Sequence, residues 1–155
     1  MERNTLKKEI PVTKGQSIGI NIERLGTGGE GVGRVDGFTV FVQGALPGEN
    51  VEAVIETVKK NYAAGKLLRI IKESKDRTAP QCPIYKECGG CQLQAMSYEE
   101  QLKFKERKVK NHLLRIGKFK ENEIHMLPIM GMKEPWRYRN KAQFPIGRDK
   151  NGKII

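Results

Sequence analysis

The sequence has 155 residues, of which 37% are hydrophobic and 30% are charged, and it carries a net charge of +11 with a pI near 9.7. This composition allows one ordinary domain or two small ones but excludes a large hydrophobic core, and no stretch reaches the ~20 apolar residues needed to cross a bilayer. The charge favours a polyanionic partner, because each neutralised phosphate releases condensed counterions; a basic surface that only confers solubility is the alternative.

The first segment, residues 1–15, is charged and is predicted to be a loose arm. It contains no apolar core of signal-peptide length, so a cytoplasmic, reducing location and no membrane partner are expected. The charge is uneven, because residues 1–80 carry 13 Lys and Arg against 10 Asp and Glu, whereas residues 81–155 carry 16 against 8. The second half is therefore expected to supply most of the attraction for an anion.

Residues 16–72 have the pattern of a small β-barrel. Apolar residues alternate with polar or small ones in the first expected strand, at Ile18, Ile20 and Ile22. A glycine-rich turn and strand at 26–33 and strands at 38–42, 51–58 and 63–71 follow. Five short strands at this spacing predict an antiparallel barrel of the oligonucleotide-binding (OB) type. Because the glycine-rich run lacks the ending of a P-loop, a phosphate-cradling role is discounted.

Basic and aromatic side chains of this barrel are candidate contacts for RNA. Small barrels of this type bind single strands through basic grooves and aromatic stacking. The candidates are Arg34, Lys59, Lys60 and Tyr62.

A polar linker is predicted at residues 73–81, and three cysteines follow it. Cys82, Cys88 and Cys91 have the spacing Cys-x5-Cys-x2-Cys, which in a reducing compartment favours a metal centre over disulfides. Zinc would need a fourth ligand, for which His112 and His125 are available but not at a customary spacing. An iron–sulfur cluster would need a fourth thiolate from elsewhere, and a redox-active cysteine pair is a third reading.

An amphipathic helix is predicted after Ser97, which forms an expected capping box with Glu100. It is expected to end at Gly117. Its apolar stripe is expected to contain Tyr98, Leu102, Val109, Leu113 and Ile116. For its basic residues, a solvated helix face is favoured over RNA contact; these are Lys103, Lys105, Arg107, Lys108 and Lys110.

A strand-rich stretch is expected after Pro128. It includes a cluster of cations around one aromatic ring. This cluster could bind RNA through phosphate contacts and base stacking, or it could be a strand whose charged side chains only face water. The cluster consists of Arg137, Tyr138, Arg139 and Lys141.

Three motifs in this order resemble the bacterial RNA (uracil-5-)-methyltransferase family. The cysteine motif with residues 92–94 and the helix that follows is similar to the cluster region of the rRNA-modifying branch. Residues 28–33, with 41–42 and 45–49, resemble a TRAM domain, the small RNA-binding barrel of that family. Residues 136–141 resemble the segment that leads into the family's central domain.

The resemblance implies a mainly β fold with an α+β second part. A five-stranded OB-like TRAM barrel would be followed, in residues 82–155, by the cluster segment, one amphipathic helix and the start of a β-rich central RNA-binding domain. Cys82, Cys88 and Cys91 would match three ligands of a 4Fe–4S cluster whose fourth ligand is not in this chain. The full-length enzyme would use S-adenosylmethionine to form 5-methyluridine in RNA, with 23S rRNA favoured.

The resemblance also implies that the chain carries no catalytic residue and no S-adenosylmethionine site, so that alone it would bind RNA as a monomer without methylating it. One alternative is a self-contained RNA-binding protein with a structural zinc or iron–sulfur site. Another is a redox or metal sensor acting through Cys88 and Cys91.

Overall fold

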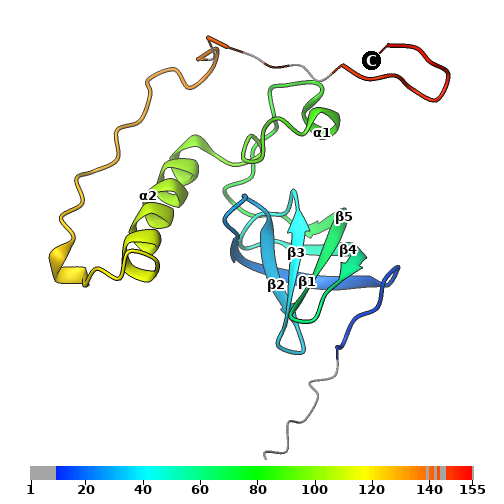
Figure 1. The fold of residues 1–155 in the computed structure, drawn as a ribbon, viewed down its shortest axis with the longest axis horizontal. Helices are drawn as coiled ribbons and strands as arrows, with labels where there is room; N and C mark the ends of the chain where they lie inside the picture. Colours follow the sequence, from blue (N-terminus) through cyan, green and yellow to red (C-terminus); the bar gives the residue numbers. More distant parts are fainter. Residues whose placement is uncertain (1–9, 139, 142, 144–145, 155) are drawn as a thin grey trace, which may run out of the picture.

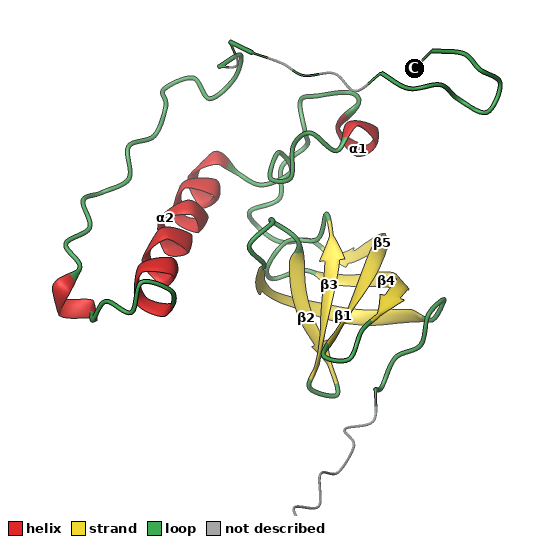
Figure 2. Ribbon diagram, viewed as in Figure 1, coloured by secondary structure: helices red, strands yellow, loops and turns green. Residues whose placement is uncertain are grey.

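The computed structural model describes residues 10–138, 140–141, 143 and 146–154 (Figure 1). A β-barrel comes first, followed by a cysteine-containing loop, one long helix and an extended segment (Figure 2). The elements are β1 (Ser17–Leu25), β2 (Gly31–Val35), β3 (Phe38–Gln43), β4 (Asn50–Val58), β5 (Tyr62–Lys72), α1 (Tyr85–Cys88), α2 (Tyr98–Arg115) and the 3₁₀ turn η1 (Glu121–Glu123). The described part of the chain has no helix long and apolar enough to span a membrane.

The predicted five-stranded barrel is confirmed, and it closes in the order β1-β2-β3-β5-β4. Four of its strand pairs are antiparallel, but β3 and β5 run parallel, with Thr39 opposite Tyr62. A ring with an odd number of strands cannot alternate in direction all the way round. The wholly antiparallel arrangement expected from the sequence is therefore corrected at this one pair.

The barrel core is built from the side chains that the alternating pattern directs inward. In β1 these are Ile18, Ile20 and Ile22, all buried. Residues 1–9 of the predicted arm lie outside the described residues. Val12 is buried in the barrel core, and the Gly15 amide donates to the Ile55 carbonyl over 2.7 Å, so residues 12–15 belong to the barrel.

Gly33 marks the closest approach between β1 and β2. A Cβ at this position would lie 2.3 Å from the Asn21 carbonyl oxygen and 2.8 Å from the Ile20 side chain. The two strands shift register between Ile22 and Arg24, where a bulge bends β1 around the barrel. A residue without a side chain is therefore required at Gly33 for the barrel to close.

Ser97 caps the N-terminus of helix α2, and its hydroxyl accepts from the Glu100 amide over 3.4 Å. In a full capping box the Glu100 side chain would also accept from the Ser97 amide, but here that amide has a different partner. The Ser97 amide donates to the Asp76 carbonyl over 2.8 Å, and the Glu100 carboxylate pairs with Arg107. The expected cap is therefore half right, because a residue from before the cysteine loop takes the place of the Glu100 side chain.

The apolar stripe of α2 is only partly covered. The segment after η1 runs back along the helix (Figure 1), and the Met132 amide donates to the Tyr98 hydroxyl over 2.8 Å. In contrast, Val109 is 52% exposed and Ile116 is 74% exposed. The stripe is therefore covered unevenly, since Tyr98, Leu102 and Leu113 are half-buried while Val109 and Ile116 are exposed.

The strand-rich stretch expected after Pro128 is not seen among the described residues of that region. They form an extended segment whose one pairing is an isolated bridge between Arg148 and Ile154. Extended chain becomes a strand only when a neighbouring segment pairs with it. None of the described residues there provides such a neighbour over more than one position.

Candidate nucleic-acid interface

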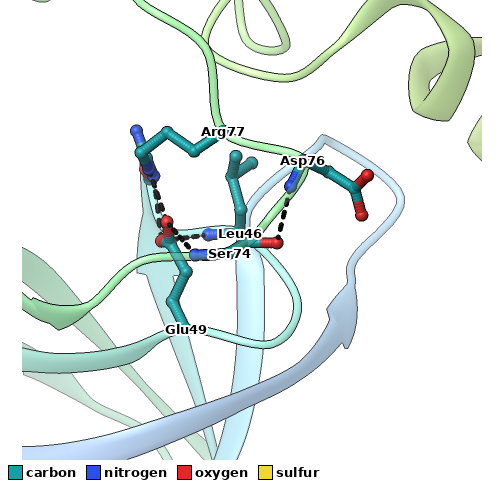
Figure 3. Close-up of polar contacts among 6 residues, drawn as sticks. Leu46, Glu49, Ser74, Asp76 and Arg77 are labelled. Atoms are coloured by element: carbon teal, nitrogen blue, oxygen red, sulfur yellow. Dashed lines mark hydrogen bonds and ion pairs between the residues drawn. The ribbon is translucent and has the colours of Figure 1, made fainter.

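A buried ion pair fixes the segment after β5 to the barrel (Figure 3). The Glu49 side chain is fully buried, and its carboxylate accepts from the Leu46 amide over 2.8 Å. Arg77 donates to both oxygens of that carboxylate, in one case over 2.9 Å, and to the Gly44 carbonyl over 2.8 Å. Residues 73–77, predicted as part of a linker, are therefore held against the barrel at a defined point.

The same point anchors both ends of the cysteine loop. Arg77 and Met96 form a β-bridge, and the Thr78 amide donates to the Ala95 carbonyl over 2.8 Å. Gly29, in the loop between β1 and β2, lies so close to Leu93 that an added Cβ would be 3.0 Å from that side chain. The glycine-rich run thus packs against the cysteine loop.

The cysteine loop itself is open to solvent. Cys88 and Cys91 are exposed, Cys82 is half-buried, and all three are free thiols. Gly89 ends the short helix α1 in the left-handed conformation, with φ of 65°. Between the loop's two arms, the Cys82 amide donates to the Gln94 side chain over 2.9 Å.

The donor types suit a thiolate-bound metal, but their arrangement does not yet form one site. No three His, Cys, Asp or Glu side chains gather as a ligand set in the part of the chain that the structure describes. His112 lines a groove beside the barrel, and His125 lies in the exposed segment after η1. Neither histidine joins the cysteines, so no histidine among the described residues supplies a fourth zinc ligand.

A cavity of about 820 Å³ adjoins the cysteine loop. Cys91 lines it, together with Arg137 and Tyr138, so the structure brings two of the predicted RNA contacts next to the cysteine motif. Trp136 also lines the cavity, although the sequence marked it only as part of a family motif. Lys141 is exposed. Arg139, which was predicted with them, lies outside the described residues.

A second groove, of about 740 Å³, separates α2 from the barrel. Lys108 spans it, donating from Nζ to the Thr27 carbonyl over 2.8 Å. Arg34, a predicted contact, lines this groove from β2. The other cations that line it are Arg24 on β1 and Arg107, Lys108 and Arg115 on α2.

Two of these groove residues were missed from the sequence. Arg24 and Arg115 are far apart in the chain, and only the docking of α2 beside β1 brings them to one groove. The helical spacing of Arg107, Lys108 and Arg115 places them near one face of α2. That spacing is the signal available in the sequence, but it does not reveal which face meets the barrel.

The remaining predicted contacts lie at the turn between β4 and β5. Lys59 and Lys60 are exposed in that turn. Tyr62 begins β5 and packs edge-on against Phe41, with ring centroids 5.5 Å apart. Arg34 and Tyr62 both pair with Thr39, from opposite sides of β3. Arg34 and Tyr62 are therefore two strands apart on the outer surface of the barrel.

Two other lysines of α2, which do not line the groove, are paired with carboxylates. Lys103 Nζ lies 2.7 Å from a Glu99 oxygen, and Lys110 Nζ lies 2.6 Å from a Glu121 oxygen. The hydrogen bond and the positive charge of Lys103 lower the pKa of Glu99, and Lys110 does the same for Glu121. Lys103 and Lys110 thus have the pairing expected of a solvated helix face.

Comparisons with known proteins identify the barrel. Residues 11–68 match the family model of the TRAM domain. The chain is 52% identical over 149 residues to an "uncharacterized RNA methyltransferase" of Clostridium tetani, covering 96% of this chain and 32% of that protein. It is 44% identical over 154 residues to a protein given the same description from Listeria monocytogenes, covering 99% and 32%.

The chain spans about a third of the length of these curated relatives. Among solved structures, a conserved protein from Methanococcus maripaludis is 33% identical, covering 44% of this chain and all of that chain with a TM-score of 0.39.

Proposed function

We propose that this chain, which contains a TRAM domain and is related to proteins named RNA methyltransferases, is the RNA-binding part of such an enzyme. The observation that carries the proposal is the match of the barrel to the TRAM domain, together with the cation-lined groove beside it. The net charge of +11 adds the long-range attraction that brings a polyanion to this surface.

The chemistry proposed for the full-length enzyme is methylation of uracil C5 in RNA by S-adenosylmethionine, with 23S rRNA as the favoured substrate. The resemblance of the cysteine motif to the rRNA-modifying branch supports this choice. A uracil base must leave its stacked structure before its ring can be modified, which costs free energy. An RNA-binding module offsets part of that cost by orienting the RNA strand, and this is the role proposed for residues 16–71 and for the basic second half of the chain.

Binding of single-stranded RNA by this chain is expected to weaken steeply with salt. With about five phosphate contacts on a single strand, the affinity is expected to fall about 100-fold between about 50 and 200 mM salt. Fluorescence anisotropy with a labelled RNA of about 16 nucleotides measures this slope. A peptide nucleic acid of the same base sequence, which lacks phosphates, is the control and is expected to bind far more weakly. Equal affinity for both probes, or no salt dependence, would contradict the proposal.

We also propose that Cys82, Cys88 and Cys91 bind a metal centre, with a 4Fe–4S cluster preferred and zinc as the alternative. The support is the presence of three free thiols within ten residues of an open loop. Metal binding is commonly coupled to local folding, so the loop is expected to rearrange as the sulfurs gather.

Anaerobic reconstitution with iron and sulfide is expected to load the chain with both, measured as iron and acid-labile sulfide per chain. The triple variant with serine at Cys82, Cys88 and Cys91 is expected to bind neither, because serine hydroxyls do not replace thiolates as cluster ligands. Zinc bound to wild type in place of iron would favour the alternative centre. If wild type and variant contained equal amounts of iron and of zinc, neither an iron–sulfur cluster nor a zinc ion would be bound by these cysteines.

A further inference from the structure

The groove between α2 and the barrel has an excess of positive charge that the described residues do not neutralise. Five cationic side chains line it against two carboxylates, those of Glu23 and Glu100. Glu100 already pairs with Arg107. No ion pair is seen for Arg24, Arg34 or Arg115 among the described residues. Three guanidinium groups in one groove therefore remain available for an external anion.

These three arginines come from separate elements and converge at one place. Arg24 is on β1, Arg34 is on β2 and Arg115 is in the last turn of α2. The bond from Lys108 to the Thr27 carbonyl holds the helix against the loop that follows β1. The position of Arg115 relative to Arg24 and Arg34 therefore depends on where α2 lies beside the barrel.

The lining of the groove also contains apolar side chains. Phe104 is half-buried in it, and Met96 is buried in it. A guanidinium group can donate two parallel hydrogen bonds to one phosphate, and an aromatic ring can stack with an unpaired base. A duplex keeps its bases stacked inside, so it could use the arginines but not the Phe104 ring.

We infer that this groove binds the backbone of a single RNA strand, with phosphates at Arg24, Arg34 and Arg115 and a base against Phe104. The inference rests on the proposed RNA-binding function and assigns it a location. From Arg34 the RNA strand can continue across the outer face of β3 to Tyr62. Arg34 and Tyr62 lie on either side of Thr39 in β3, since each of them pairs with that residue. Helix α2 is then part of the RNA-binding surface and not only a connection.

Two double variants of the whole chain test the location. Arg34→Ala with Arg115→Ala removes two unpaired groove cations, whereas Lys103→Ala with Lys110→Ala removes two paired cations outside the groove. Both variants lower the net charge by two, so they affect long-range attraction equally. All four positions lie at the surface of their elements, and melting temperatures near that of wild type would verify folding.

The groove variant is expected to bind a single-stranded RNA of about 16 nucleotides about tenfold more weakly or worse. Its slope of log affinity against log salt should fall by about 1.4, the value for two lost contacts on a single strand. The lysine variant is expected to lose less than about threefold. Equal losses in the two variants, or a wild type that prefers a duplex of the same length, would overturn the inference while leaving RNA binding intact. A wild type that binds no RNA would instead overturn the proposed function.

Discussion

Replacing Arg77 with alanine is expected to lower the free energy of unfolding by about 3 kcal/mol or more, the cost of leaving a buried charge without its partner. The Glu49 side chain is fully buried, and that of Arg77 is only 15% exposed. In the variant, the Leu46 amide would still donate to Glu49, but the compensating positive charge would be lost. The segment that carries the cysteine loop would also lose its bond to the Gly44 carbonyl.

A second arginine in the same barrel provides the matched control. Arg69 pairs with Glu52, but their side chains are 73% and 29% exposed. Surface pairs of this kind contribute about 0–1 kcal/mol, since water solvates the charges that remain. Urea unfolding followed by circular dichroism compares Arg77→Ala with Arg69→Ala directly. Similar midpoints for both variants would show that the Glu49–Arg77 pair does not hold the fold together.

The barrel could be predicted from the sequence because its determinants are local. Alternation at Ile18, Ile20 and Ile22 sets which face of β1 is buried, and turns that contain glycine separate β1 from β2, β2 from β3 and β3 from β4. The parallel pairing of β3 with β5 was missed, because strand order depends on closure of the whole ring. Local pattern thus gives the elements, and the closed ring gives their directions.

The Glu49–Arg77 pair and the groove could not be predicted in the same way. Glu49 belongs to the 45–49 segment that resembles a TRAM domain, but no local pattern in the sequence predicts that its carboxylate is buried. Its burial follows from the return of Arg77 to the barrel, 28 residues later. Likewise, Arg107 and Lys108 belong to a basic run that usually faces solvent, and only the docking of α2 directs them to the barrel. Long-range contacts of this kind leave no periodic signal.

For the cysteines, in contrast, the sequence is more informative than the fold. Their spacing and type are plain in the sequence, and the structure adds that Cys91 shares a cavity with Arg137 and Tyr138. The positions of the sulfur atoms around a metal are a different matter, because the metal itself organises such a loop. Residue type therefore predicts a candidate metal site here, and the reconstitution with iron and sulfide tests it.

Gly33→Ala is expected to destabilise the barrel by about 1–3 kcal/mol, the usual cost of forcing an extra methyl group into a packed interior. The new Cβ would lie 2.3 Å from the Asn21 carbonyl oxygen, which belongs to the backbone and cannot rotate away. Relief would require β1 and β2 to separate where Ile22 pairs with Gly33. A shift of β2 would also displace Arg34, so RNA affinity is expected to fall together with stability.

Gly19→Ala is the control, since Gly19 also lies in β1 but an added Cβ there would meet nothing within 4 Å. Alanine is favoured over glycine in a regular strand by roughly 0.5–1 kcal/mol, so this variant is expected to be neutral or slightly more stable. Thermal melts of the two variants beside wild type measure the difference. If Gly33→Ala and Gly19→Ala had the same melting temperature, the contact between β1 and β2 could not be as close as 2.3 Å implies. If only Gly33→Ala lost both stability and RNA affinity, closure of the barrel would be linked to the position of Arg34 in the groove.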